Sequence, residues 1–374
     1  MNKKIAFGTT LLDKGLLSSG IDGIGQYCQE LLNQFSRQAG GINISPYSFG
    51  IDSSPSNARP LPAYPSYLAK SLLRINNQSA AKQYFDSVDL IHSTDQLIPI
   101  VNNKPLVVTV MDTIPLSHPQ FIKARSRIIK PFLWKKLTQR ADHIITISEF
   151  SKGQIIEFMD YPSEKITSIP LGVDERYFEK ISNEVTEVAL TKLKITKPFF
   201  LFIGSIQPRK NLQRLIEAHS LLPRNLAKEF PLVIAGKFAW DDADTLKTLE
   251  KGIQEDRCIW LNYVSDFEKR CLLQSTMGMA FTSLYEGFGL PILEGFASGT
   301  PVITSDYSSM PEVAGNAALL ADPKNIDSIR DALISLIDDQ SLVEKLKLNG
   351  AVQAKKFSWE KTTNETEKIY QAVL

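Results

Sequence analysis

The feature that most constrains the fold is a repeated alternation of short apolar runs with segments of helical periodicity. Runs such as VDLIHST (88–94), PLVVTVMD (105–112) and ADHIITIS (141–148) are continuous and rich in β-branched residues. Strands of this kind are typical of parallel sheets whose two faces are both covered by helices. The alternation therefore predicts an α/β fold built from doubly wound parallel sheets.

The alternation occurs in two series. The first ends with KITSIPLG (165–172), and the second begins with PFFLFIGS (198–205). The residues between them are more polar and less periodic, which indicates a domain boundary, and a length of 374 residues suits two domains. We therefore predict two Rossmann-like domains, over 1–175 and 190–355, and a C-terminal helix within 356–374 that packs back on the first domain.

Composition excludes several classes of protein. The net charge is +1, which gives no reason to expect a nucleic-acid partner. Cys28, Cys258 and Cys271 form no closely spaced pair, and a chain without a disulfide framework suits a reducing compartment. We see no signal peptide and no apolar run long enough to span a bilayer, so we expect a cytoplasmic protein.

The histidines do not suggest a metal site. The four of them are scattered, and none has another histidine or a cysteine at the spacing of metal ligands. His143, on an apolar strand, fits a core or capping position better. We therefore expect an enzyme that needs no metal ion and no other cofactor.

Two carboxylates stand in a segment that otherwise has the composition of a protein interior. Glu286 and Glu294 are separated by seven residues that are all glycine, proline or apolar. The segment has the pattern strand, glycine loop, helix, with Pro291 suited to the first helical turn and Glu294 expected in that turn. Such a helix N-terminus is a phosphate-binding position. We interpret the two carboxylates as facing a ligand, the alternative being a helix cap and a solvated charge.

A basic pair follows the first strand of the second series. Arg209 and Lys210 come after PFFLFIGS and before the helical segment LQRLIEAHSLL (212–222). A guanidinium and an ammonium in that position could neutralise a leaving diphosphate in place of a metal ion. The alternative is a pair of solvated surface charges.

Together these motifs resemble the retaining nucleotide-sugar glycosyltransferases of the GT-B fold. That group includes bacterial mannosyltransferases and glycogen-synthase-like enzymes. The resemblance covers nearly the whole chain, and its fold has two Rossmann-like domains that face each other across a cleft. Its most specific segments are GSIQPRKNLQRLIEA (204–218), SLYEGFGLPILEGFASGTPVI (283–303) and SSMPEVAGNAALLADP (308–323).

The resemblance implies a role for each matching residue. Glu286 would approach the donor sugar, Glu294 would hold the ribose hydroxyls, and Val264 would lie near the base. Pro311 and Glu312 would support the site, the alternative for Glu312 being a structural cap. Backbone contacts to phosphate and sugar would come from the loop, and the diphosphate would be gripped by the basic pair, which assigns these roles to Gly287, Phe288, Gly289, Leu290, Arg209 and Lys210.

The first domain carries weaker motifs, and the resemblance makes it the acceptor side. Gly23 and Gly25 precede a helix but match a dinucleotide-binding motif poorly. The resemblance places them at the cleft, and the alternative is a flexible loop with a helix start. Many relatives have a His–Asp pair where this chain has Met111 and Asp112. Two roles stay open for Asp112, in acceptor binding or in ordering its loop.

A basic stretch with interleaved apolar residues covers 121–140 and contains no acidic residue. The pattern predicts a surface that contacts anionic lipid headgroups. The alternative is an ordinary pair of helices with a solvated basic face. The basic residues of the stretch are Lys123, Arg125, Arg127, Lys130, Lys135, Lys136 and Arg140.

The resemblance implies transfer of a hexose from a nucleotide-diphosphate sugar to an acceptor hydroxyl with retention. Mannose from GDP-mannose is the first expectation for the donor. A lipid-linked saccharide of surface polysaccharide, such as lipopolysaccharide, is the expected acceptor. Two alternatives stay open: a nucleotide-sugar epimerase of the same two-domain fold, and a non-catalytic sugar-binding protein.

Overall fold

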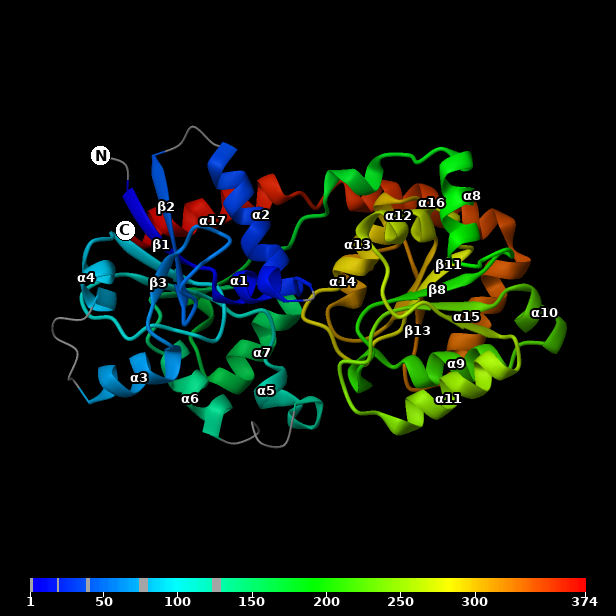
Figure 1. Cartoon of the computed structure of the whole chain (residues 1–374), viewed down its shortest axis with the longest axis horizontal. Helices are drawn as coiled ribbons and strands as arrows, with labels where there is room; N and C mark the ends of the chain where they lie inside the picture. The colour runs from blue at the N-terminus through cyan, green and yellow to red at the C-terminus, as the bar shows by residue number, and fades with distance from the viewer. Residues whose placement is uncertain (1–2, 19, 38–40, 74–79, 123–128) are drawn as a thin grey trace. The chain divides into compact units, whose positions relative to one another are not determined.

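The apolar runs form two parallel sheets, one in each of two units of the chain (Figure 1). The structure is a computed structural model that describes residues 3–18, 20–37, 41–73, 80–122 and 129–374. Unit 1 comprises residues 1–172 and 359–374, and unit 2 comprises residues 173–358. The predicted pair of Rossmann-like parallel sheets is thus confirmed.

Unit 1 contains a seven-stranded sheet in the order β3-β2-β1-β4-β5-β6-β7, and every neighbouring pair is parallel. In the middle of the sheet, Ile5 of β1 pairs with Leu90 of β4. The central strands are buried on both faces, as their continuous apolar sequence predicts. The strands are β1 (Lys3–Gly8), β2 (Ile42–Phe49), β3 (Arg59–Leu61), β4 (Leu90–Ser93), β5 (Leu106–Thr109), β6 (His143–Thr146) and β7 (Ile166–Ser168).

The sequence supplies a side-chain cap for a helix of unit 1. Helix α7 begins after Ser148, whose hydroxyl accepts a hydrogen bond from the amide of Ser151 at 3.0 Å. The described helices are α1 (Thr10–Leu17), α2 (Gly23–Arg37), α3 (Tyr64–Leu72), α4 (Ala80–Asp86), α5 (Ile114–Ser117), α6 (Ile129–Thr138), α7 (Glu149–Met159) and α17 (Trp359–Val373), with 3-10 turns at Pro119–Phe121 and Ser163–Lys165.

Helix α17 belongs to unit 1 although unit 2 precedes it in the sequence. It packs against α2, and Figure 1 shows the two helices side by side. Tyr370 of α17 is fully buried and stacks on Phe35 of α2 at 6.0 Å between ring centroids. Its hydroxyl lies 2.6 Å from Nδ1 of His92 on β4, and Nε2 of His92 lies 2.7 Å from the hydroxyl of Thr109. Neutral hydrogen bonds thus tie α17 to the sheet of unit 1.

Unit 2 contains a six-stranded parallel sheet in the order β10-β9-β8-β11-β12-β13. Helices α9 and α11 pack together beside it, as do α13 and α16 (Figure 1). The strands are β8 (Phe200–Ile203), β9 (Leu232–Ala235), β10 (Cys258–Trp260), β11 (Gly278–Phe281), β12 (Val302–Ser305) and β13 (Leu319–Ala321). The helices are α8 (Asn183–Lys192), α9 (Leu212–Ser220), α10 (Arg224–Glu229), α11 (Ala243–Gln254), α12 (Asp266–Ser275), α13 (Leu290–Ala297), α14 (Met310–Ala314), α15 (Ile326–Asp338) and α16 (Gln340–Ala354), with 3-10 turns at Glu175–Phe178 and Pro208–Lys210.

The polar segment between the two series of strands has more regular structure than its sequence suggests. It holds the 3-10 turn Glu175–Phe178 and helix α8, which the hydroxyl of Ser182 caps by accepting from the amide of Val185. Helix α8 packs on α12, so tertiary contact compensates for its weak periodicity. Among the described residues, no helix combines the length and the apolar character that crossing a bilayer requires.

Candidate active site

The strand order of unit 2 identifies where a ligand would bind. From β8 the chain continues through β9 and β10 toward one edge of the sheet, and then through β11, β12 and β13 toward the other. Ligands of open α/β sheets bind outside the carboxyl ends of the strands at such a switch point. Two loops leave the switch point, 204–211 after β8 and 282–289 after β11. They contain three predicted charged residues, Arg209, Lys210 and Glu286.

These three residues form one ion-paired cluster. Oε2 of Glu286 lies 2.6 Å from Nη1 of Arg209, and Oε1 lies 2.6 Å from Nζ of Lys210. Glu286 is 7% exposed and Lys210 is 8% exposed. A buried carboxylate is costly unless cations compensate it, and here each oxygen has its own cation. The Arg209–Lys210–Glu286 cluster therefore explains how charges can stand in this apolar segment.

The cluster controls the protonation of its members. Burial alone would raise the pKa of Glu286, but the positive charges of Arg209 and Lys210 outweigh it and lower that pKa to about 2. Burial lowers the pKa of the Lys210 ammonium, and Glu286 offsets part of that effect. The ammonium also lies 4.7 Å from the centre of the Phe281 ring, a favourable cation–π distance. Glu286 is consequently an ionised, weakly basic carboxylate at neutral pH.

Backbone contacts lock the two loops together. The carbonyl of Arg209 accepts a hydrogen bond from the amide of Leu284 at 2.7 Å, and Nη1 of Arg209 donates to the carbonyl of Tyr285 at 3.2 Å. Asn211 has a left-handed backbone with φ 60°, and its side-chain amide donates to the carbonyl of Thr282 at 2.9 Å. Arg209 and Lys210 thus stand on a fixed 3-10 turn. Preorganised donors of this kind stabilise developing negative charge efficiently.

The glycine loop leads directly into α13, as predicted. Gly289 has φ +116°, a conformation that L side chains rarely adopt, and it precedes the first helical residue Leu290 without a side-chain cap. The hydroxyl of Ser309 donates to the carbonyls of Glu286 and Phe288 at 2.9 and 2.8 Å, which orders the loop. Gly287 and Phe288 are buried. The N-terminal amides of α13 therefore follow directly after the loop that carries Glu286.

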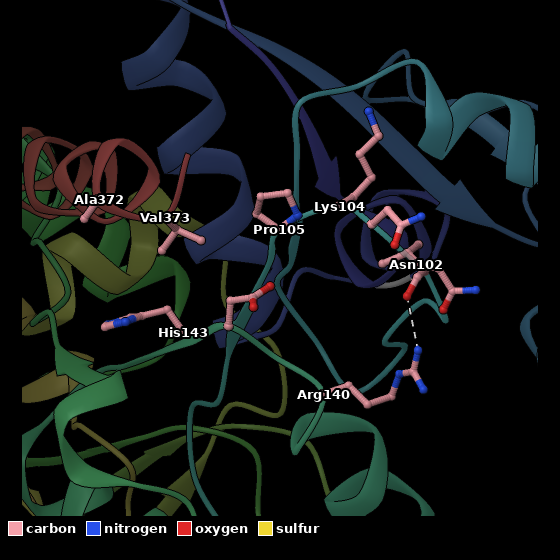
Figure 2. A pocket seen from close by; sticks show the side chains of 10 residues that line it. Asn102, Lys104, Pro105, Arg140, His143, Ala372 and Val373 are labelled. Atoms are coloured by element: carbon pink, nitrogen blue, oxygen red, sulfur yellow. Dashed lines mark hydrogen bonds between the residues drawn. The ribbon is translucent and has the colours of Figure 1, made fainter.

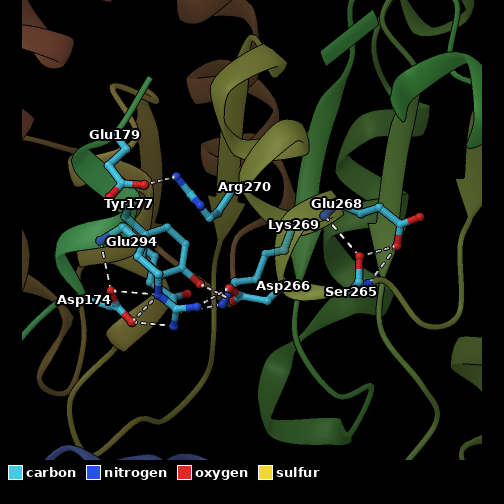
Figure 3. Close-up of polar contacts among 10 residues, drawn as sticks. Asp174, Tyr177, Glu179, Ser265, Asp266, Glu268, Lys269, Arg270 and Glu294 are labelled. Carbon is cyan, nitrogen blue, oxygen red and sulfur yellow. Dashed lines mark hydrogen bonds and ion pairs between the residues drawn. The ribbon is translucent and has the colours of Figure 1, made fainter. Parts of the chain in front are cut away.

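One detail of the predicted helix was wrong. Glu294 was expected in the first turn of α13, but the helix begins at Leu290, so Glu294 is its fifth residue and lies in the second turn. The helix dipole has little effect at that depth. Glu294 is stabilised instead by the ammonium of Lys269 on α12, which lies 2.7 Å from its Oε1 (Figure 3).

Lys269 and its neighbours were not predicted as site residues. Glu294 is 4% exposed, and the ammonium of Lys269 also lies 5.2 Å from the centroid of the Tyr177 ring. Lys269 lies in the segment SDFEKRCLLQST (265–276). A basic residue among other charges is typical of the solvated face of a helix. Only the fold shows that a buried carboxylate faces it.

The remaining predicted residues of unit 2 surround these elements. Val264 is partly buried and immediately precedes Ser265, the N-cap of α12. Pro311 and Glu312 lie in the first turn of α14, where Pro311 is partly buried and Glu312 is exposed. Their roles near the base and in support of the site stay predictions.

In unit 1, Gly23 and Gly25 lie in the first turn of α2 and not ahead of the helix as predicted, and Asp112 lies in the loop that follows β5. Gly23 is the first residue of α2, and the amide of Gly25 donates to Oδ1 of Asp22 at 2.8 Å. Oδ1 of Asp112 accepts a hydrogen bond from the amide of Ile114 at 3.0 Å, at the start of α5. The carbonyl of Met111 accepts from the hydroxyl of Ser151 at 3.1 Å. Asp112 thus orders its own loop, which leaves its role toward an acceptor a prediction.

Unit 1 also holds a buried carboxylate that sequence reasoning missed. Its strand order reverses between β1 and β4, and Asp95 follows β4 at that point. Asp95 is 6% exposed, and its Oδ1 accepts a hydrogen bond from the amide of Leu97 at 2.7 Å. Burial raises its pKa to about 6. In the sequence STDQLIP (93–99) this residue has the pattern of an ordinary turn.

A hollow of about 820 Å³ lies elsewhere on unit 1 (Figure 2). Pro105 and Asp142 on its wall immediately precede β5 and β6, so it opens at the amino-terminal edge of the sheet. Nη2 of Arg140 in this hollow donates to the carbonyl of Val101 at 3.1 Å. Because ligands of such sheets bind at the opposite edge, we place the candidate site at the switch point and not here.

Two further predictions concern metals and the basic stretch. Within the described part of the chain, no group of three His, Cys, Asp or Glu residues is arranged to hold a metal ion. His143 lies with Nε2 2.8 Å from the hydroxyl of Thr167. In the stretch 121–140, Ile129 and Phe132 are exposed apolar residues of α6. Its residues Lys123, Arg125 and Arg127 lie outside the described residues.

Comparison with known families identifies both halves of the chain. Residues 187–353 match the family described as Glycosyl transferases group 1, and residues 21–177 match Glycosyltransferase Family 4. The first match contains every site residue assigned to unit 2, and the second contains Gly23, Gly25 and Asp112.

Individual relatives agree. The chain is 35% identical over 259 residues to the O-antigen chain mannosyltransferase B of Escherichia coli, an alignment that covers 69% of this chain and 67% of that protein. It is 31% identical over 282 residues to the serotype-specific mannosyltransferase WbdA of Escherichia coli, covering 73% of this chain but only 34% of that longer protein. Among solved structures, sucrose-phosphate synthase from Thermosynechococcus elongatus shares the fold with a TM-score of 0.77 at 19% identity, over 99% of this chain and 98% of that one.

Proposed function

The chain belongs to the group 1 glycosyltransferases, and from this premise we propose that it transfers a hexose from a nucleotide-diphosphate sugar to the hydroxyl of a saccharide acceptor. The observation that carries the proposal is the Arg209–Lys210–Glu286 cluster at the switch point of unit 2. It places two cations and one ionised carboxylate where a doubly wound sheet binds its ligand.

The cations suit the leaving group. As the bond between sugar and phosphate breaks, negative charge grows on the departing diphosphate. A guanidinium has five N–H donors in a planar fork, so Arg209 can bind phosphate oxygens and still contact Glu286. Lys210 adds a point charge, and the N-terminal amides of α13 add donors. We propose that these groups replace a metal ion in stabilising the diphosphate.

Glu286 is suited to orient the donor sugar and is not suited to act as a nucleophile. Both of its oxygens face cations, and its pKa is lowered to about 2, so it is a poor base and a weak nucleophile. A double displacement would need a nucleophile on the opposite face of the sugar. We therefore propose retention by a same-face route, in which the leaving phosphate helps to deprotonate the acceptor. Glu286 would orient the sugar and stabilise the positive charge that grows on its ring.

The finer substrate assignments rest on the relatives. Two proteins at 31–35% identity carry the name mannosyltransferase, and one of them is named for the O-antigen chain. We propose mannose from GDP-mannose as the donor and a lipid-linked saccharide of surface polysaccharide as the acceptor. Glu294 would hold the ribose, and Val264 would lie near the base.

An acceptor attached to lipid would require the enzyme to work at a membrane surface. We propose peripheral contact through the stretch 121–140, supported by exposed Ile129 and Phe132 beside the basic residues Lys135 and Lys136 of α6. Apolar side chains next to lysines are typical of surfaces that bind anionic headgroups. Cosedimentation with vesicles of phosphatidylglycerol, compared with phosphatidylcholine, tests this contact.

A thermal-shift screen against GDP-, UDP-, ADP- and dTDP-sugars tests the donor. A ligand that binds the folded protein raises Tm with concentration, and we expect the largest rise with GDP-mannose. NMR of a reaction with the preferred donor and a mannoside acceptor should show an α-linked product. Formation of an epimer from donor alone would favour the epimerase alternative. The absence of any shift with all four donors would contradict the proposal.

A further inference from the structure

A lysine on α12 contacts both a buried carboxylate and an aromatic ring (Figure 3). Nζ of Lys269 lies 2.7 Å from Oε1 of Glu294 and 5.2 Å from the centroid of the Tyr177 ring. Glu294 and Tyr177 are both buried. The ion pair and the cation–π contact both hold the ammonium, and the side chain of Tyr177 also interacts with Glu294 itself. Lys269 therefore has little freedom to move relative to Glu294.

Tyr177 belongs to the 3-10 turn Glu175–Phe178, and side chains of this turn contact α12. The hydroxyl of Tyr177 donates to Oδ1 of Asp266 at 3.3 Å. Burial, and then the negative charges of Glu294 and Asp266, raise the pKa of Tyr177, so the hydroxyl remains a donor. Arg176 pairs with Asp266 at 3.2 Å. The ring that supports Lys269 is consequently held in place from the same helix.

The charge of Lys269 is important for Glu294 because this carboxylate is buried. A carboxylate at 4% exposure is destabilised strongly when its cation is removed. An ammonium on one oxygen also fixes the plane of the carboxylate. The remaining lone pairs can then accept hydrogen bonds from two neighbouring hydroxyls in one orientation. Vicinal hydroxyls of that kind are present on the ribose of a nucleotide.

We propose that Lys269, supported by Tyr177, is a positioning residue that holds Glu294 in the orientation that binds the two ribose hydroxyls of the donor nucleotide. This inference rests on the proposed function, in which Glu294 contacts the ribose. Lys269 itself acts through the carboxylate and does not touch the nucleotide. The 3-10 turn Glu175–Phe178 thereby contributes a side chain to the support of the nucleotide site.

Binding of nucleoside diphosphates with and without ribose hydroxyls tests the proposal. Calorimetry of the full chain would compare GDP and UDP, each with its 2′,3′-dideoxy analogue. For the unmodified protein we expect the hydroxylated form of the preferred nucleotide to bind roughly 10-fold to 100-fold more tightly, as hydrogen bonds to a charged group imply. In Lys269→Met this ratio should fall toward one through weaker binding of the hydroxylated form, while binding of the dideoxy form stays within about twofold.

Matched variants separate positioning from a general structural effect. Arg270→Met removes the neighbouring basic residue. Arg270 pairs with Glu179, just after the 3-10 turn that carries Tyr177, at 3.0 Å, and not with Glu294. Arg270→Met should keep the full ratio of affinities for the hydroxylated and the dideoxy nucleotide. Lys269→Arg keeps the charge and should retain most of the ratio. If Lys269→Met does not fold, Tyr177→Leu provides the second test, with an expected loss of roughly twofold to fivefold in the ratio.

Three results would overturn the inference. An equal loss of affinity for both forms in Lys269→Met would show an effect on the fold or on phosphate binding. An unmodified protein that binds nucleoside diphosphates without distinguishing the dideoxy forms would refute the role of Glu294 and leave the proposed function intact. A protein that binds neither GDP nor UDP would overturn the proposed function as well.

Discussion

The two sheets share a topology and differ in the chemistry at their switch points. In unit 2, the loops after β8 and β11 meet through the ion pairs of the Arg209–Lys210–Glu286 cluster. In unit 1, the loops after β1 and β4 meet through neutral hydrogen bonds. The hydroxyl of Thr94 donates to the carbonyl of Gly8 at 2.6 Å, and Asp95 stands beside them as a buried carboxylate without a paired cation in the described structure. The same fold therefore supports a strand-end site with paired cations in unit 2 and, in unit 1, one whose buried carboxylates Asp13 and Asp95 have no ion pair among the described residues.

We propose that this difference matches the two kinds of ligand that glycosyl transfer requires, with the diphosphate at unit 2 and the saccharide acceptor at unit 1. A diphosphate needs fixed positive charge, which costs little when a carboxylate compensates it. A saccharide is neutral, and hydroxyl and carbonyl groups are sufficient to bind it. Four variants test the difference between the two switch points.

Glu286→Gln should have the largest effect. It keeps the shape of the side chain but removes the charge that would stabilise the sugar as the diphosphate leaves, so we expect turnover to fall by roughly 10² to 10³. Steady-state kinetics with the preferred donor measure this change, and calorimetry should show binding of the nucleoside diphosphate within a few fold of the unmodified protein. Unchanged turnover would contradict the assignment of the site to unit 2.

Asp95→Asn should change the stability of unit 1. The folded pKa of Asp95 is about 6, above its ordinary value of 3.8, so the folded state binds the proton more tightly than the unfolded state does. Ionisation therefore costs stability as pH rises from 4 through 6, by up to about 3 kcal/mol above pH 6. The variant does not ionise at this position, so its free energy of unfolding should exceed that of the unmodified protein by an amount that grows between pH 4 and pH 7. Urea titrations followed by hydrogen exchange across β4 measure it, and a pH-independent difference would exclude a raised pKa.

Lys210→Met should weaken binding of the nucleoside diphosphate about tenfold. It removes one point charge from the cluster, whereas Arg209 remains to compensate Glu286, so the fold should persist. Titration calorimetry at two salt concentrations measures the change, and the variant should show the weaker salt dependence. An unaltered dissociation constant would remove Lys210 from the phosphate site.

Tyr370→Phe should have the smallest effect, confined to unit 1. It deletes the hydrogen bond to Nδ1 of His92, whose pKa burial already lowers to about 3, and a lost buried hydrogen bond costs on the order of 1 kcal/mol. Hydrogen exchange should accelerate in β4 and α17 while β9 of unit 2 serves as the internal control. Equal acceleration in β9 would mean that the two units do not unfold separately.

Much of the fold could be predicted because the central strands are continuous apolar runs. Strand β2 was missed, since Asn43, Ser45 and Pro46 interrupt its pattern and proline argues against an inner strand. The structure explains the exception. β3 pairs only with Tyr47–Phe49, so Pro46 lies where β2 has no neighbour on that side.

The candidate site could be predicted from the sequence only where a charged residue lies among apolar or glycine neighbours. Glu286 is conspicuous among glycine and apolar residues, and Arg209 follows an apolar strand. Lys269 and Asp95 lie among polar neighbours, so their burial depends on which helix or strand end packs over them. No local pattern contains that information, and the pairing of Lys269 with Glu294 joins positions 25 residues apart.

Unit 1 is discontinuous in the sequence, because α17 returns to it after the whole of unit 2. On the ribosome, unit 2 can therefore finish folding while the sheet of unit 1 still waits for the helix that carries Tyr370. The domain synthesised first is completed last. During that interval, the surface of α2 that Tyr370 later covers is open to chaperones, which gives the nascent chain a vulnerable stage at its N-terminal half.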